Sequence, residues 1–328
     1  MGENILHLDS LDVSPHVEGI EITKSSDSNE KCISVKDPEL ECFLCVADSF
    51  PIVPGDIIEI GTVELQVHRY KFASASVQGV RQRMEDANYC TDSMHVGATC
   101  LSMFSVYDGH GGIECSRFLR ANFHSMFSSL YLNSLNVHSA LSSAFKVSET
   151  KFLQMFKERG FSQNVGAVLN VVVIDSSALY CANLGDCRAL LGLTDGKIVE
   201  LSRDHKPGLE EEADRIRRLG GKVIGNRVNG RLAVSRALGD YEYKFNKVGE
   251  NIVSSVPEIV QHGLTGGEQF LVLGSDGLFD VMSSETVGTF VRNRLWEDPK
   301  KICLDLISEA VLQRGSTDNV TVIVVLFK

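Results

Sequence analysis

The last strand-forming stretch of the chain constrains the fold more than any other segment. Residues 319–327, NVTVIVVLF, are almost continuously apolar and rich in β-branched side chains, which favour extended backbone. A strand with one face in water alternates apolar and polar residues, whereas a continuous apolar run is typical of a strand buried on both faces. The sequence therefore predicts a sheet that lies inside the molecule, with other layers around it.

The order of the other elements indicates the fold class. Strand-like stretches lie at 102–108, 167–175, 178–193 and 270–276, and an Asp-Gly turn at 194–197 begins a hairpin. Apolar residues at helical spacing or charges typical of helix ends predict helices over 118–130, 137–156, 208–221, 284–295 and 299–313. Tight turns between neighbouring strands favour antiparallel pairing, and helices come in pairs between the strands. We predict an α+β fold with helices outside antiparallel sheets.

Acidic residues occur at the ends of these strands and in the turns between them, mostly beside glycine. They are Glu85, Asp86, Asp108, Asp186, Asp276, Asp280 and Asp318. One such aspartate is usually a turn or capping residue, but strands of one sheet can bring their ends together. Carboxylates that meet raise one another's pKa unless cations lie between them. An all-oxygen set of this kind suits Mg²⁺ or Mn²⁺ rather than zinc.

Glycines surround one of these acids in the stretch FSVYDGHGG, residues 104–112. Gly109, Gly111 and Gly112 permit backbone angles that other residues avoid, and they leave space beside Asp108. We therefore expect that the Gly109 carbonyl can act as a metal ligand and that a phosphate can approach.

Seven motifs follow one another in order. They are QGVRQRMEDA (78–87), VYDGHGG (106–112), NLGDCRALL (183–191), DHKPGLEEEADRI (204–216), RVNGRLAVSRALGD (227–240), SDGLFDVM (275–282) and STDNVTVIVV (316–325). Together they resemble the metal-dependent protein serine/threonine phosphatases of the type 2C family, over residues 66–328. The chain departs from the family pattern at VGAVLN (165–170) and at Cys187, where the family commonly has Ser.

The resemblance implies a four-layer sandwich, in which two antiparallel β-sheets are flanked by paired α-helices. It implies two Mn²⁺ or Mg²⁺ ions at one end of the sandwich and a weaker third site. The implied ligands are Asp108 to both ions, Asp276 and Asp318 to the first, Glu85 and the Gly109 carbonyl to the second, Asp86 through water, and Asp186 and Asp280 for the third.

The resemblance also implies the reaction. A hydroxide that bridges the two ions attacks phosphorus directly, without a phosphoenzyme, in phosphoserine and phosphothreonine proteins. Arg81 matches the arginine that grips the substrate phosphate, and His110 is placed to protonate the departing oxygen. Considered alone, Arg81 would form a surface ion pair with Glu85. The alternative function is a catalytically silent pseudophosphatase that acts as a binding module.

Residues 1–65 differ from the rest and are expected to form a partly β extension that packs on the catalytic domain, 66–328. The stretch 53–70 predicts short strands around a Pro-Gly-Asp turn, and it resembles the closing strands of a forkhead-associated domain. That likeness covers under 20 residues and lacks an upstream phosphothreonine-binding loop. Within the catalytic domain, residues from about 222 to 260 correspond to the family's variable flap.

Composition limits the partners and the compartment. A net charge of −11 makes nucleic acid an unfavourable ligand. The nine cysteines are an odd number in a long chain, which favours reduced thiols in the cytoplasm or nucleus over a disulfide framework. No window predicts a transmembrane helix or a secretory signal, so we expect no membrane partner, and we expect a monomer.

Overall fold

The computed structural model describes residues 70–159, 165–244 and 251–327, and four short strands before residue 70. The chain divides into two compact units, Met1–Arg69 and Tyr70–Lys328. In the first unit, β1 (Val35–Asp37) pairs with β2 (Leu40–Cys42) and β3 (Ile57–Ile60) pairs with β4 (Val63–Gln66), both antiparallel. The Pro-Gly-Asp turn at 54–56 lies outside the described residues. The packing of the extension on the catalytic domain stays a prediction.

Two antiparallel sheets form the centre of the second unit. The five-stranded sheet has the order β11-β10-β16-β17-β5, and the six-stranded sheet has the order β15-β9-β8-β7-β6 with β14 paired to β8. The strands of the first are β5 (Lys71–Val77), β10 (Arg188–Leu193), β11 (Ile198–Glu200), β16 (Glu268–Gly274) and β17 (Val320–Leu326). Those of the second are β6 (Ala87–Val96), β7 (Thr99–His110), β8 (Gly166–Ile174), β9 (Ala178–Leu184), β14 (Leu238–Gly239) and β15 (Glu258–Gly263). Pairings within both sheets are antiparallel, so that prediction is confirmed.

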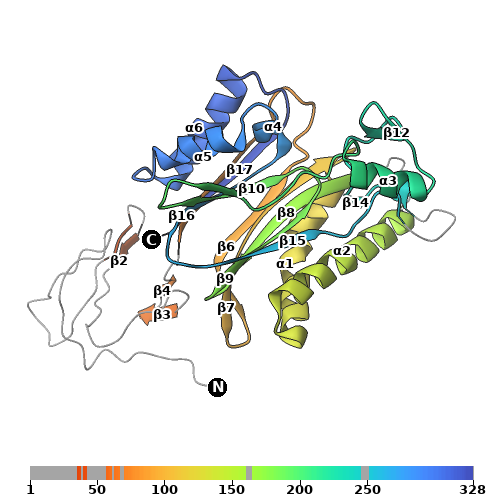
Figure 1. Cartoon of the computed structure of the whole chain (residues 1–328). Coiled ribbons are helices and arrows are strands. Elements are labelled where there is room, and N and C mark those ends of the chain that lie inside the picture. The colour runs from red at the N-terminus through yellow and green to blue at the C-terminus, as the bar shows by residue number, and fades with distance from the viewer. Residues whose placement is uncertain are drawn as a thin grey trace, which may run out of the picture. The chain divides into compact units, whose positions relative to one another are not determined.

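Helices cover the outer sides of both sheets. Figure 1 shows α1 and α2 along the six-stranded sheet, and α5 and α6 along the five-stranded sheet. The helices are α1 (Glu114–Ser134), α2 (Val137–Arg159), α3 (Glu210–Arg218), α4 (Asp276–Phe279), α5 (Ser284–Arg292) and α6 (Pro299–Ser308). Each predicted helix is present, but the one expected over 299–313 changes to a π-helical turn, Glu309–Gln313, after Ser308.

Apolar side chains fill three clusters, one on the outer side of each sheet and one between the two sheets. Strand β17 illustrates the arrangement, because Val322 and Val324 face α5 and α6 while Ile323 and Val325 face the six-stranded sheet. Every residue of β17 is buried, which confirms the prediction made from 319–327. Strand β7 likewise places Met103 in the cluster against α1 and α2 and its neighbour Phe104 between the sheets.

The flap region contains short elements. A hairpin of β12 (Val223–Ile224) and β13 (Arg227–Val228) is followed by β14 and by a 3₁₀ turn, Tyr241–Tyr243. Residues 251–257 then lead into β15. Residues 245–250 lie outside the described part of the chain. Two strands of the flap, β14 and β15, thus join the six-stranded sheet, where they pair with β8 and β9.

None of the helices that the structure describes is both long enough and apolar enough to cross a lipid bilayer.

Helix α3 is tied to the flap by a charge cluster around Glu212, a side chain that is 2% exposed. Its two oxygens accept hydrogen bonds from Arg215 at 2.8 Å and from Arg236 at 2.6 Å. Burial alone raises the pKa of Glu212, but the hydrogen bonds from the arginines outweigh it and lower the pKa to about 2. Because the folded pKa lies below the ordinary value of 4.5, this stabilisation is complete above pH 4.5 and is lost as the pH falls towards 2.

We predict that Glu212→Gln lowers the free energy of unfolding by about 2 kcal/mol at pH 7, since charge-assisted hydrogen bonds are lost. The difference from wild type should narrow at pH 3.5. Urea unfolding at the two pH values measures both effects. Asp214→Asn is the matched control, because Asp214 pairs with Arg217 on the exposed side of the same helix and should matter little. An equal loss at both pH values would show that ionisation of Glu212 is not the cause.

Candidate active site

Asp108 projects from inside a strand rather than from its end. The sequence suggested that the strand stops at Asp108, but β7 continues to His110 and pairs with Gly166, Ala167 and Val168 of β8. The residues before and after Asp108 are therefore also paired within the sheet, which fixes the backbone of Asp108. This rigidity suits a carboxylate that must keep a fixed position.

The other predicted acids come from turns next to the strands. Glu85 and Asp86 directly precede β6, Asp186 lies between β9 and β10, and Asp318 lies just before β17. Asp276 begins α4 immediately after β16, and Asp280 ends that short helix at an exposed position. These turns bring acids from both sheets to one region.

Ser275 connects three of these segments. Its hydroxyl donates to Asp86 Oδ2 at 2.9 Å and accepts from the backbone N–H of Thr321 at 3.0 Å. Its own N–H donates to the Thr321 carbonyl at 3.1 Å. The end of β16, the start of β17 and the segment before β6 are thereby fixed to one another.

The acids disfavour one another's ionisation. Burial, together with the charges of Asp86, Asp276, Asp186 and Asp318, raises the pKa of Asp108 well above its ordinary value. Burial also raises the pKa of Asp86 to about 6, with a further contribution from Asp318. The pKa of Asp276 rises to about 7 because of burial and then the charges of Asp186, Asp280 and Asp318. Ionising these groups together is costly unless a cation compensates.

Two side-chain cations pair with members of this acidic cluster. Arg81, which is 57% exposed, forms an ion pair with Asp318. The ion pair is thus with Asp318, not with Glu85 as the residue considered alone suggested. Lys206 forms an ion pair with Asp186, whose side chain is 4% exposed. Lys206 was not among the predicted site residues, although it lies in the DHKP motif at 204–207.

The donor chemistry fits hard divalent cations. Within residues 70–159, 165–244 and 251–327, no three His, Cys, Asp or Glu side chains already stand in a metal-binding arrangement. The acids are nevertheless oxygen donors only, and their raised pKa values report repulsion that Mg²⁺ or Mn²⁺ would relieve. Cys187 is fully buried, and burial together with the charges of these acids raises the pKa of its thiol well above the ordinary value.

His110 is held by a buried carboxylate that sequence reasoning missed. Its Nε2 donates to both oxygens of Asp240, at 2.9 and 3.0 Å, and Asp240 is 2% exposed. Burial alone lowers the pKa of His110, but Asp240 first, and Asp186 and Glu85 after it, raise it above its ordinary value. Gly166 makes room for this pair, since a Cβ there would lie 2.4 Å from Asp240 and 2.5 Å from His110. The only signal in the sequence is the position of Asp240 at the end of the motif 227–240.

Gly109 provides the expected space, but it does not adopt the expected special backbone angle. Gly111 and Gly112 adopt φ angles of 70° and 152°, as expected of glycine. Gly109 does not have a positive φ angle. A glycine is needed there for space, because a Cβ would lie 2.5 Å from the Glu85 carbonyl oxygen and 2.9 Å from the Ser116 hydroxyl. The Ser116 hydroxyl donates to that carbonyl, so helix α1 approaches the segment that carries Glu85.

Asn319 holds the segment that carries Arg81, and sequence reasoning also missed it. Its amide donates to the carbonyls of Gln78 at 2.7 Å and Arg83 at 3.0 Å. Its Oδ1 accepts from the N–H of Glu85 at 2.7 Å, and the residue is 5% exposed. One side chain therefore fixes the loop 78–85 beside Asp318.

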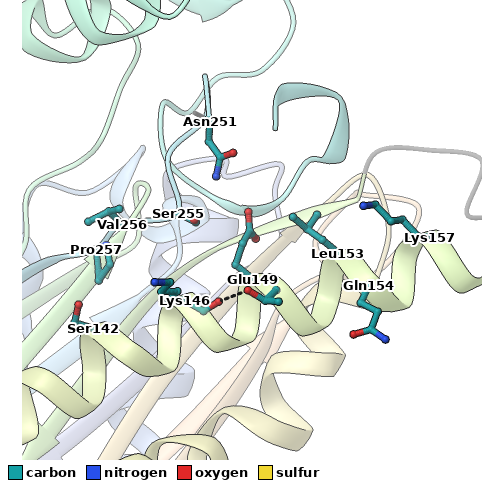
Figure 2. A pocket seen from close by; sticks show the side chains of 11 residues that line it. Ser142, Lys146, Glu149, Leu153, Gln154, Lys157, Asn251, Ser255, Val256 and Pro257 are labelled. Carbon is teal, nitrogen blue, oxygen red and sulfur yellow. Dashed lines mark hydrogen bonds between the residues drawn. The ribbon is translucent and has the colours of Figure 1, made fainter. Parts of the chain in front are cut away.

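A groove of about 650 Å³ lies apart from the acids, between the outer face of α2 and residues 251–257. Figure 2 shows Lys146, Glu149 and Leu153 of α2 turned towards Asn251 and Val256. Behind the groove, Glu149 accepts from the N–H of Gly239 at 2.8 Å and pairs with the buried Lys244 at 2.8 Å. Because Gly239 precedes Asp240, this buried ion pair supports the backbone that holds His110.

Comparison with known proteins places this architecture in a family. The family model described as protein phosphatase 2C matches residues 70–320, which include the described acids, Arg81 and His110. The chain belongs to the protein phosphatase 2C family. The resemblance inferred from the seven motifs is thereby confirmed, and this membership supports a phosphatase function.

Named relatives and a solved structure agree with this assignment. The chain is 38% identical over 267 residues to "Probable protein phosphatase 2C 27" of Arabidopsis thaliana, covering 79% of this chain and 69% of the relative. It is 34% identical over 290 residues to "Probable protein phosphatase 2C 5" of Paramecium tetraurelia, covering 82% and 97%. The serine-threonine phosphatase 2C of Toxoplasma gondii shares the fold, with a TM-score of 0.67, 20% identity and coverage of 79% and 95%.

We predict that Asn319→Ala raises the KM for a phosphopeptide more than it lowers kcat, because the loop that carries Arg81 loses its three hydrogen bonds. The same change should lower the free energy of unfolding by about 2–4 kcal/mol. Steady-state kinetics and urea unfolding measure the two effects. Asn122→Ala is the control, since Asn122 makes one hydrogen bond within α1, to Phe118. A wild-type KM in a folded Asn319→Ala protein would contradict this role.

Proposed function

We propose that residues 66–328 form a Mn²⁺- or Mg²⁺-dependent phosphatase that acts on phosphoserine and phosphothreonine in proteins. The observation that carries the proposal is the meeting of acids from separate segments: Ser275 links Asp86 to the ends of β16 and β17, and burial with the charges of four aspartates raises the pKa of Asp108. Bringing these acids together at mostly half-buried positions costs free energy that a role in turns alone does not require. Family membership supports the same conclusion.

The residues that would hold the ions are those that the motifs indicated. They are Asp108, Asp276 and Asp318 for one ion, Asp108, Glu85 and the Gly109 carbonyl for a second, Asp86 through water, and Asp186 with Asp280 for a weaker third. When bound, such ions lower the pKa of a water molecule and neutralise charge on the phosphoryl oxygens.

The side chains around the acids supply the remaining chemistry. Arg81 is exposed enough to reach a phosphate and is a bidentate donor, so we assign it to the phosphoryl oxygens of the substrate. Asp240 favours the protonated form of His110. Because Nε2–H donates to Asp240, the proton on Nδ1 is the one available for the departing serine or threonine oxygen. The oxygen of a water molecule bonds to phosphorus as the P–O ester bond breaks, this proton moves to the leaving oxygen, and the proton that the water gives up restores the protonated form of His110.

The cysteines support direct hydrolysis by water rather than a thiolate mechanism. Cys115 begins the segment CSRFLR, but its spacing is not that of a cysteine-phosphatase loop. The residue is fully buried, and burial with the charges of Glu149 and Asp240 raises the pKa of its thiol well above the ordinary value. A protonated, inaccessible thiol is a poor nucleophile. No covalent phosphoenzyme is therefore part of the proposal.

The finer architecture belongs to the same proposal. Three apolar clusters separate the helices and sheets, which supports a four-layer sandwich of two sheets flanked by paired helices. We assign residues 1–65 to an extension outside the catalytic domain, in keeping with the division of the chain after Arg69. The flap, about 222–260, contributes Asp240 to the proposed reaction.

We predict that the full chain releases phosphate from a phosphothreonine peptide in Mn²⁺ or Mg²⁺ and that EDTA stops the release. Asp276→Asn should lower kcat by about 100-fold or more, because it removes a proposed metal ligand. Asp195→Asn is the control, since Asp195 pairs with Lys197 in an exposed hairpin turn and should leave activity unchanged. Folded protein that releases no phosphate in millimolar metal would favour the alternative, a pseudophosphatase that only binds.

A further inference from the structure

The position of Lys206 is set by backbone hydrogen bonds of the residue before it, His205. The N–H of His205 donates to the Gly185 carbonyl at 2.9 Å, and the N–H of Ser235 donates to the His205 carbonyl at 3.0 Å. Residue 205 is thus hydrogen-bonded to the turn that carries Asp186 and to the flap. Lys206 follows it directly, so its reach towards Asp186 is set by the fold.

The side chains of the neighbouring residues strengthen this attachment. His205 is fully buried, and its Nδ1 accepts from the N–H of Gly185 at 3.1 Å. Its Nε2 must therefore carry the proton, which it donates to Glu258 of β15 at 3.2 Å. On the other side, Asp204 accepts two hydrogen bonds of 2.8 Å from Arg188 of β10. The segment 204–206 is anchored to both sheets.

The charge of Lys206 acts on Asp186 and Asp280, the proposed ligands of the third ion, and on Asp276. Its ammonium pairs with Asp186, and its side chain is 29% exposed against 4% for Asp186. Burial disfavours its charge, but Asp186, and then Asp280 and Asp276, raise the pKa of Lys206 above its ordinary value. The ammonium group of Lys206 therefore already pairs with Asp186, the carboxylate that a third divalent ion would need.

We propose that Lys206 is an internal counter-cation that competes with a divalent ion for Asp186. The inference rests on the proposed function, because Asp186 matters to metal only if the acids hold metal. Ammonium and divalent cation repel each other and cannot share the same carboxylate oxygens at full strength. The third ion then binds only when Lys206 releases Asp186. The competition keeps this site weaker than the other two without any change in its ligands.

The partial exposure of Lys206 makes such a release possible. The Lys206 side chain has four rotatable carbon–carbon bonds and is partly exposed to solvent, so it can move away from Asp186. Arg188, by contrast, is held in place by two hydrogen bonds to Asp204. Removing the lysine charge, without touching any proposed ligand, should therefore tighten metal binding at Asp186. Removing Asp186 should abolish it.

The test is calorimetric titration of the full chain with Mn²⁺, comparing wild type with Lys206→Gln. The glutamine amide can still donate to Asp186, which guards against misfolding, and circular dichroism checks the fold. We expect the weakest Mn²⁺ site to bind about tenfold more tightly in Lys206→Gln, as expected when two competing ligands become one. Lys206→Arg keeps the charge and should bind like wild type. Asp186→Asn should lose the weakest site in both backgrounds.

The control is Lys197→Gln, which removes a lysine from an exposed pair with Asp195 and should leave Mn²⁺ binding unchanged. An unchanged affinity of the weakest site in folded Lys206→Gln would overturn the inference, and so would tightening in Lys197→Gln. Phosphate release distinguishes failure of the proposed function from failure of this inference. In that case phosphate release is absent from every variant, including wild type, whereas the Mn²⁺ titration still decides whether Lys206 competes for Asp186.

Discussion

The crowding of several carboxylates at one place, most of them half-buried, is the constraint on which the rest of the structure depends. Asp108 lies within a central strand, and the other acids lie in turns beside strands of both sheets. Each acid disfavours the ionisation of its neighbours, as the raised pKa values of Asp86 and Asp276 show. A folded domain gains no stability from such an arrangement. The surrounding sheets and helices have to provide enough apolar burial to tolerate it.

A small number of hydrogen bonds holds the segments of the site in fixed positions. Ser275 joins two strand ends to Asp86, Asn319 holds the loop of Arg81, and His205 fixes the turn of Asp186 to β15. In each case one polar side chain connects segments that are far apart in sequence. These connections place the acids, Arg81 and His110 on rigid supports, which is what catalysis by fixed charges requires.

The sequence predicted the elements and the acids but not the contacts between them. The apolar run 319–327 indicated a strand buried on both faces because strand periodicity is local information. The partnership of His110 with Asp240 spans 130 positions, and that of Asn319 with Gln78 spans 241. Local patterns such as periodicity and motif spacing carry no information about partners so far apart in the sequence. The helix expected over 299–313 was wrong beyond Ser308, because apolar spacing does not distinguish an α-helical turn from a π-helical one.

The central claim is that the crowded acids around Asp108 are kept for a divalent cation at a cost in stability. The most direct measurement is the melting temperature of wild type and Asp108→Asn, each in EDTA and in Mn²⁺. In EDTA the variant should melt higher, by about 2–4 °C for each kcal/mol of repulsion relieved. In Mn²⁺ the wild type should gain stability and the variant should gain less, which reverses the order. A wild type that melts higher in EDTA and does not respond to Mn²⁺ would contradict the account.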